Sequence, residues 1–157
     1  MSQATFGQQP THASTDAFDI SVSEDKRAFT LRFSDMLAAV DAGKASAPVA
    51  TRTFSLVLPL ESAPDTVQIS FAVSGFAFAS NAANGYAVLS VNGRTSVMEF
   101  PSGTDQEFVQ ELELEAEPTS ECRISLFLLA ERELADPLAA ATVSTLSIDA
   151  EVLPRPA

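Results

Sequence analysis

The sequence lacks the residues on which several classes of protein depend. Of its 157 residues one is a cysteine, Cys122, one is a histidine, His12, and none is a tryptophan. A lone cysteine cannot form an internal disulfide, and one cysteine with one histidine cannot supply the about four ligands of a zinc site. Disulfide-stabilised scaffolds and zinc modules are therefore excluded.

Basic residues are also scarce. Lys and Arg number 9 against 21 Asp and Glu, which gives a net charge of −12 at pH 7. A surface of this charge repels phosphate backbones and anionic headgroups, so we expect no nucleic-acid partner and no binding to membrane surfaces. No apolar run approaches the ~18 residues of a membrane span, so no membrane insertion is expected. Because the N-terminus does not resemble a secretory signal, we expect a cytoplasmic protein, or a secreted one if a leader is removed.

Apolar residues are abundant enough for one core. The hydrophobic fraction is 46%, and 157 residues suit one domain of the usual ~100–200 residues. Residues 1–16 are polar and lack apolar periodicity, which predicts a flexible N-terminal arm. A single domain is expected over 17–153, followed by a short tail over 154–157.

Strict alternation of apolar and polar residues predicts about nine short β-strands. The first two, within 17–22 and 28–33, are joined by a predicted turn at 24–26. Asn92-Gly93 predicts a hairpin, because both residues tolerate the positive φ of a type I′ turn. With turn signals about every 8–12 residues, the pattern predicts an all-β protein, an antiparallel β-sandwich of the jelly-roll kind.

Two segments suggest short helical turns within this β-rich chain. Ser34 and Asp35 have the side chains of a helix cap, and the apolar residues after them predict a short helical turn that ends at Gly43. Residues 131–141 predict either one helical turn or a long loop, broken at Pro137.

Two strands depart from simple alternation. The parity of the apolar residues changes at Gly75, because Phe76 and Phe78 follow apolar residues at odd positions, and this predicts a bulge. The run 124–129 is apolar on both faces, which predicts a strand that is covered on both sides.

One segment resembles a known family. Residues 23–33, SEDKRAFTLRF, are similar to the S-P-D-x-x-x-x-T-x-x-F entry of a family of small secreted β-sandwich proteins of unknown function, and 52–56 continue the likeness. Glu24 replaces the family's proline, Phe54 occupies a cysteine position, and the partner cysteine is absent too. Loss of both cysteines suits a reducing compartment. The resemblance implies a β-sandwich and brings no function.

A row of carboxylates is the most conspicuous chemistry. Glu111, Glu113, Glu115 and Glu117 alternate with apolar residues, and side chains two apart on a strand stand ~6.5–7 Å apart. That spacing would let them share a divalent cation or a basic partner. The other interpretation is a solvated strand face whose like charges discourage pairing between sheet edges.

Calcium is the one cofactor that the sequence leaves open, and no other is expected. Asp16, Asp19 and Asp149 lie near the two chain ends, which can come together in a jelly roll, and they are the candidate metal ligands. No loop matches a known calcium motif, so the hypothesis depends on charge and fold class alone.

Carbohydrate binding would need an aromatic surface, because the flat face of a ring stacks on sugar C–H groups while polar neighbours bind the hydroxyls. The candidates are Asn81 and Asn84, as amide donors, and Tyr86, the single tyrosine. Exposed phenylalanines could take the place of tryptophan.

Catalysis is not expected. His12 lies in the predicted arm, and the charge of Glu121 would raise the pKa of the neighbouring Cys122 thiol. We therefore predict a non-catalytic interaction or structural module that binds a protein partner or assembles with itself into a homo-oligomer, through the arm or a sheet edge. The alternative is a calcium-associated or carbohydrate-binding module.

Overall fold

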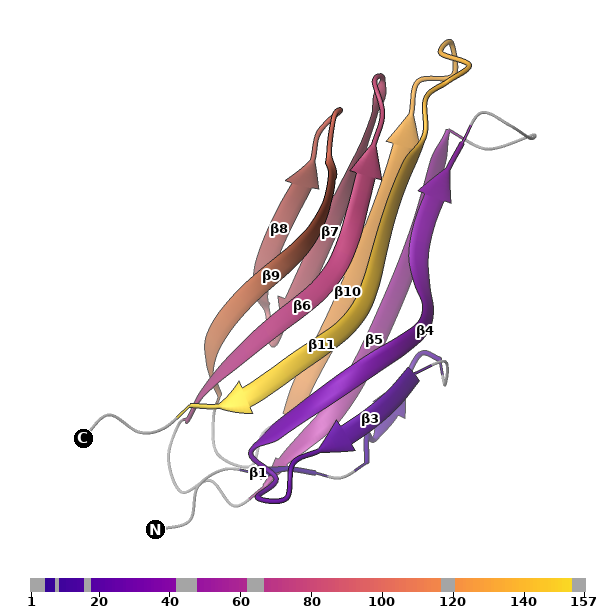
Figure 1. Ribbon diagram of the computed structural model, residues 1–157. Helices are drawn as coiled ribbons and strands as arrows, with labels where there is room; N and C mark the ends of the chain where they lie inside the picture. Colours follow the sequence, from indigo (N-terminus) through magenta and orange to yellow (C-terminus); the bar gives the residue numbers. More distant parts are fainter. Residues whose placement is uncertain are drawn as a thin grey trace.

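The computed structural model describes residues 5–7, 9–15, 18–41, 48–61, 67–116 and 121–153, which form two antiparallel β-sheets packed face to face (Figure 1). The strands are β1 (Thr5–Phe6), β2 (His12–Ala13), β3 (Phe18–Val22), β4 (Ala28–Val40), β5 (Val49–Glu61), β6 (Val67–Ala79), β7 (Ala83–Val91), β8 (Arg94–Phe100), β9 (Asp105–Ala116), β10 (Glu121–Arg132) and β11 (Ala141–Val152).

The strand order is that of a jelly roll. One sheet has the order β1-β5-β10-β7-β8, with β2 also paired to β5, and the other has the order β3-β4-β11-β6-β9. From β4 onward only β7 and β8 are consecutive strands of one sheet, and every other step crosses to the opposite sheet. This interleaving confirms the predicted jelly roll, although the described residues form 11 strands rather than about nine.

The inward faces of both sheets supply an apolar core that is rich in phenylalanine. Phe6, Phe29, Phe54, Phe71 and Phe100 are each at most 2% exposed. The rings of Phe6 and Phe29 meet edge to face with centroids 4.7 Å apart, a geometry that adds about 0.5–1.5 kcal/mol to the stabilisation from burial.

The described part of the N-terminal segment is attached to the sandwich, which corrects the expectation of a flexible arm. β1 and β2 both pair with β5. The N–H groups of Gly7 and Ser14 donate to the carbonyls of Pro59 and Ser55 at 2.8 and 2.9 Å. Phe6 is completely buried. The polar N-terminal segment is therefore held by one buried side chain, Phe6, and by backbone hydrogen bonds to the edge of β5. Residues 1–4, 8, 16, 17 and 154–157 lie outside the described residues.

The turn between β3 and β4 is hydrogen-bonded to both the first strand, β1, and the last, β11. The turn between β3 and β4 has the predicted position, with Lys26 in the left-handed region at a φ of 60°. The Phe6 N–H donates to the Lys26 carbonyl at 2.7 Å, and the Val152 N–H donates to the Arg27 carbonyl at 2.8 Å. β1 and β11 are distant in sequence, yet both donate hydrogen bonds to consecutive carbonyls of this turn.

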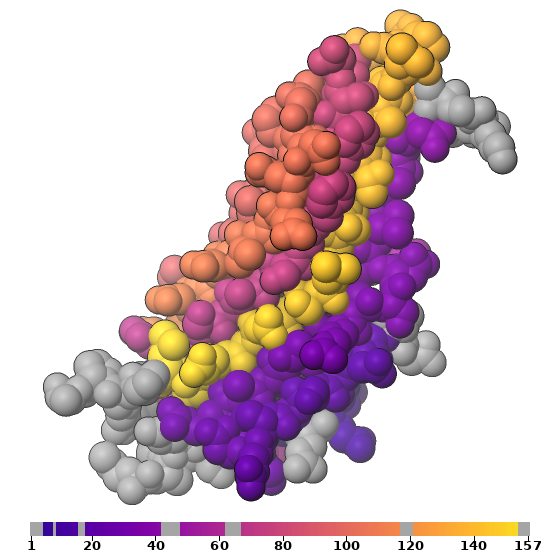
Figure 2. Space-filling model, viewed as in Figure 1, coloured from indigo at the N-terminus to yellow at the C-terminus, as the bar shows by residue number. Residues whose placement is uncertain are grey.

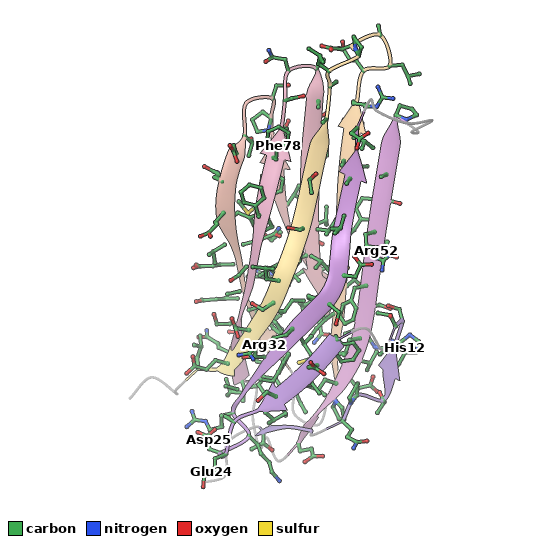
Figure 3. All side chains as sticks on the ribbon, turned by 45° about the vertical axis from the view of Figure 1, so that its right-hand side comes forward. His12, Glu24, Asp25, Arg32, Arg52 and Phe78 are labelled. Carbon is green, nitrogen blue, oxygen red and sulfur yellow. The ribbon has the colours of Figure 1, made fainter. Side chains whose placement is uncertain are left out.

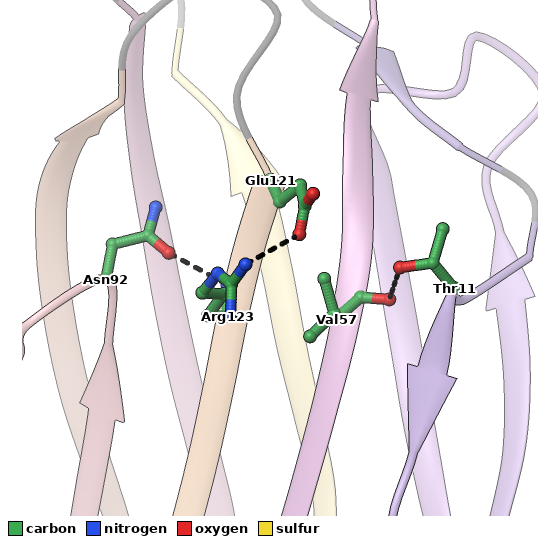
Figure 4. Close-up of polar contacts among 5 residues, drawn as sticks. All are labelled: Thr11, Val57, Asn92, Glu121 and Arg123. Carbon is green, nitrogen blue, oxygen red and sulfur yellow. Dashed lines mark hydrogen bonds and ion pairs between the residues drawn. The ribbon is translucent and has the colours of Figure 1, made fainter.

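The predicted hairpin between β7 and β8 is confirmed. Asn92 and Gly93 have φ angles of 49° and 85°, as a type I′ turn requires. The Asn92 carboxamide oxygen also accepts a hydrogen bond from the Arg123 N–H of β10 at 2.8 Å, and the Arg123 guanidinium lies 3.5 Å from Glu121 (Figure 4). At the other edge of this sheet, the Thr11 hydroxyl donates to the Val57 carbonyl at 3.4 Å.

A strand replaces the helical turn that Ser34 and Asp35 were expected to cap. β4 continues to Val40, and its last five residues pair with β11. Because β11 offers a complete ladder of backbone partners, tertiary pairing outweighs the helical spacing of the apolar side chains. Gly43 lies outside the described residues. Residues 133–140 form the loop between β10 and β11, and the described chain contains no helix that could cross a membrane.

Candidate functional site: an aromatic patch on one sheet

The last part of β6, from Gly75 onward, has its small residues in the core and two phenylalanines exposed to solvent. Gly75 and Ala77 are buried, whereas Phe76 and Phe78 are 37% and 36% exposed. The predicted bulge at Gly75 is therefore wrong, because alternation continues unchanged along β6. The irregularity is instead a shift in register on the neighbouring strand β11, between Thr145 and Ser147, which flank Leu146.

The core has no room for larger side chains at this part of β6. A Cβ on Gly75 would overlap the carbonyl oxygen of Ser144 and approach the ring of Phe108 to 2.7 Å. Phe108 also packs against Phe100, with ring centroids 4.8 Å apart. Since these rings already fill the space between the sheets here, the large side chains of β6 from Gly75 onward lie on its outer face.

The exposed phenylalanines belong to a larger apolar surface, which we call the aromatic patch. It covers the outer face of the β4-β11-β6-β9 region, the face toward the viewer in Figures 1 and 2. Diagonal neighbours on adjacent strands are ~7–8 Å apart, within reach of large side chains. The patch contains Leu37, Phe76, Phe78, Val109 and Leu146.

Polar side chains lie between the apolar ones. Phe78 is opposite Thr142 on β11 and Asp105 on β9. Phe76 is opposite Ser144 and Glu107, and the Ser144 hydroxyl donates to the Phe76 carbonyl at 3.3 Å. Each ring is therefore flanked by a hydroxyl on one side and a carboxylate on the other.

The predicted acidic row lies on the same sheet, toward the opposite end. Glu111, Glu113 and Glu115 are exposed on β9, which pairs only with β6 among the described strands, and Glu117 lies outside the described residues. The described ranges contain no group of three or more His, Cys, Asp or Glu that could hold a metal ion. The position of these glutamates on an edge strand agrees with the second interpretation, in which their like charges discourage pairing with the edge of another sheet.

The two described aspartates that were considered for calcium, Asp19 and Asp149, do not share a site. Asp149 accepts a hydrogen bond from the Thr30 hydroxyl at 2.6 Å. Asp19 stands opposite Arg32 on β4, the strand that separates β3 from β11. Asp16 lies outside the described residues.

Two of the three candidates for glycan recognition, Asn84 and Tyr86, lie on the other sheet, away from the aromatic patch. The Asn84 amide donates to the Tyr86 hydroxyl at 2.9 Å, on the outer face of β7 in the other sheet, and Asn81 is exposed in the loop before that strand. Phe127 and Leu129 lie on the same outer face and are half-buried. The strand predicted to be covered on both sides is therefore covered on one side only within the described chain.

The lone cysteine is not placed for nucleophilic chemistry. Cys122 is completely buried, and this burial, rather than the charge of Glu121, raises the pKa of its thiol to about 12. His12 is exposed on β2. A thiol that stays protonated at neutral pH is a poor nucleophile.

Comparisons with known proteins give distant structural likenesses. No family model matches the sequence, and no curated protein matches it. Among solved structures, the chain is similar to TmCBM61 in complex with β-1,4-galactotriose, at 12% identity and a TM-score of 0.32 over 92% of this chain and 86% of that one. It is also similar to the C-terminal CBM6 of LamC from Zobellia galactanivorans, at 6% identity and a TM-score of 0.34 over 94% and 97%.

A further likeness is to the CBM35 from Cellvibrio japonicus Abf62, at 12% identity and a TM-score of 0.34 over 77% of this chain and 91% of that one. These identities and TM-scores assign no ligand to the chain. The functional argument therefore depends on its own residues.

Proposed function

We propose that the protein is a non-catalytic module that binds carbohydrate on the aromatic patch. The observation that carries the proposal is the pair of outward rings, Phe76 and Phe78, at successive outer positions of one strand. Such positions are ~6.5–7 Å apart, so a saccharide chain lying along β6 can meet both rings. Sugar rings offer C–H groups to an aromatic face and hydroxyls around their rim.

The polar neighbours of the rings suit those hydroxyls. Glu107 and Asp105 accept hydrogen bonds, while Thr142 and Ser144 lie on the other side of the rings and can donate or accept. A surface of this kind differs from a purely apolar interface, because it pairs each aromatic ring with hydrogen-bonding groups at its edge.

Leaving Phe76 and Phe78 exposed lowers the free energy of unfolding below what burial of these rings would give, and a binding role would explain why they lie outside. Burying a phenylalanine contributes about 1.5–3 kcal/mol relative to leaving it exposed. The patch also gathers five of the large apolar side chains that the described chain exposes, rather than scattering them. Clustered exposed apolar groups mark binding surfaces, whereas single ones are ordinary.

The N-terminal segment favours this alternative over the expected protein partner. That segment was the predicted donor strand for a neighbour's sheet, but its described residues pair with β5 of the same chain. The edge strand β9 carries a row of like charges, which is unfavourable for strand addition.

Affinity electrophoresis against a panel of neutral and acidic polysaccharides tests the proposal. We expect at least one polysaccharide to retard the protein, and we expect Phe76→Ala and Phe78→Ala to weaken binding by about tenfold or more, equivalent to about 1.4 kcal/mol. Val97→Ala is the matched control, because Val97 is also an exposed apolar residue but lies on β8 of the opposite sheet.

Two results would contradict carbohydrate binding on the patch. One is the absence of retardation by every polysaccharide in the panel. The other is equal loss of binding in Val97→Ala and in the two phenylalanine variants. Thermal unfolding of each variant shows whether it is folded, and only folded variants are compared.

A further inference from the structure

A groove that does not include the aromatic patch lies between a strand of one sheet and a strand of the other. The groove has a volume of about 350 Å³ and opens between β4 and β5. β3 pairs with β4 only as far as Phe33, and β2 pairs with β5 only at Leu56 and Val57. Beyond these points no described strand pairs with the outer edge of either β4 or β5, so the side of the sandwich is open there.

The floor of the groove is aromatic. Phe33 and Phe54 meet edge to face with ring centroids 4.8 Å apart. Phe54 is almost completely buried beneath the groove, whereas Phe33 is half-buried and Met36 borders it. The side-chain parity of β4 changes between Phe33 and Met36, opposite the irregular step of β11, and this change places Asp35 at the rim.

An ion pair crosses the rim from one sheet to the other. A guanidinium nitrogen of Arg52 on β5 lies 3.8 Å from a carboxylate oxygen of Asp35 on β4. Their side chains are 45% and 67% exposed. Figure 3 labels Arg52 on β5. Arg52 occupies the same side of β5 as Phe54, so its side chain extends over the aromatic floor rather than onto the outer sheet face.

The two charged groups are too far apart to form a hydrogen bond with each other, so both can still form hydrogen bonds with a ligand. At 3.8 Å the pair is longer than the 2.7–3.2 Å of a hydrogen bond, and neither side chain has another polar contact in the described part of the chain. One adjacent pair of hydroxyls on a ligand could donate to Asp35 and accept from Arg52. Thr51 and Thr53, the chain neighbours of Arg52 on β5, also line the groove.

We infer that this groove is a second binding site, which takes one ring of a neutral sugar or a similar polyol. The volume lies at the small end of the ~300–1,000 Å³ of ligand pockets, and an aromatic floor with a donor and an acceptor at its rim matches the two kinds of surface on a sugar ring. Opposite charges at the rim favour a ligand without net charge. The Arg52–Asp35 pair also stands across the open edges, where it disfavours an added peptide strand.

The inference extends the proposed function without sharing any residue with the aromatic patch. NMR of the full chain labelled with nitrogen-15, titrated with free glucose, galactose, mannose and arabinose in separate experiments, tests it. We expect at least one sugar to shift the amide signals of residues 34–36 and 51–54. Arg52→Gln and Asp35→Asn should each weaken that sugar by about tenfold or more, as loss of a charge-assisted hydrogen bond implies.

Arg123→Gln is the matched control, since it removes an exposed arginine that pairs with a carboxylate at 3.5 Å elsewhere on the sandwich. This variant should bind the sugar as the unchanged protein does. Phe78→Ala should also leave the groove signals unaffected, which separates failure of the patch from failure of the groove.

Three results would overturn the inference. They are the absence of shifts in both groove segments with every sugar, shifts confined to β6 and β9, and equal affinities in Arg52→Gln and Arg123→Gln. Both arginines are exposed at the surface, so the amide spectrum of each variant should retain the dispersion of the folded protein.

Discussion

Replacing Phe6 by alanine tests whether the N-terminal segment belongs to the folded domain. The ring is completely buried and packs edge to face on Phe29 at 4.7 Å, so the substitution removes a core side chain rather than a surface one. Comparable phenylalanine-to-alanine changes cost about 3–5 kcal/mol. Because whole domains are stable by about 5–15 kcal/mol, the loss should be a large fraction of the total.

Urea denaturation followed by linear extrapolation measures this loss. We expect the midpoint to fall while the slope stays the same, since the surface exposed on unfolding hardly changes. Val97→Ala, at an exposed position of β8, should cost less than about 1 kcal/mol. A loss in Phe6→Ala as small as that of Val97→Ala would refute the packing of β1 on the core.

The same experiment at several protein concentrations tests where β1 pairs. Pairing with β5 of the same chain predicts a midpoint that does not depend on concentration. A midpoint that rises with concentration would mean that the segment pairs with β5 of a second copy, as in a domain-swapped dimer.

Three other predictions concern the core, the hairpin and the thiol. Gly75→Ala should lower the free energy of unfolding by about 1–3 kcal/mol in chemical denaturation, because its Cβ overlaps the Ser144 carbonyl; an unchanged midpoint would contradict this. Asn92→Ala should cost about 1–2 kcal/mol by thermal unfolding, since the left-handed turn and the hydrogen bond to the Arg123 N–H are both weakened. Cys122 should react with a thiol reagent only after unfolding. Its pKa is raised from 9.0 to about 12, so the stability due to the neutral thiol is complete below pH 9.0 and is lost as the pH rises toward 12. A pH titration of unfolding, with Cys122→Ala as control, shows this loss.

Local chemistry explains the parts of the fold that could be predicted from the sequence. The Asn92-Gly93 hairpin depends on residues that are adjacent in the chain, and the turn at Lys26 likewise depends on its immediate neighbours. Alternation identified most strands and predicted that they pack as two sheets, whereas the order of the strands depends on pairing that alternation does not reveal.

The predictions that failed depend on contacts between distant segments. β4 extends to Val40 because β11 pairs with it, which no local pattern reveals. A bulge was predicted at Gly75 from the change in apolar parity at Phe76 and Phe78, whereas β6 keeps its alternation because Phe108, about thirty residues away, fills the space beside Gly75. The alternation of small and aromatic residues from Gly75 onward was the signal that could have placed these rings outside.

The groove was beyond the reach of sequence analysis for a related reason. Arg52 and Asp35 come from different sheets, and their proximity depends on the open edges of both strands. The resemblance to a secreted sandwich family included residues 52–56 but pointed to a missing cysteine rather than to a charged rim.

The turn that holds Phe6 and Val152 at consecutive carbonyls also affects how the protein can be engineered and attached. Since the first and last strands meet there, a short linker could join them and the chain could be reopened in the exposed β10–β11 loop, a circular permutation that keeps both sheets. Phe78 lies toward the end of the sandwich opposite this turn (Figure 3). A protein immobilised through the turn would therefore present the aromatic patch away from its support, which is the orientation that a surface-binding assay needs.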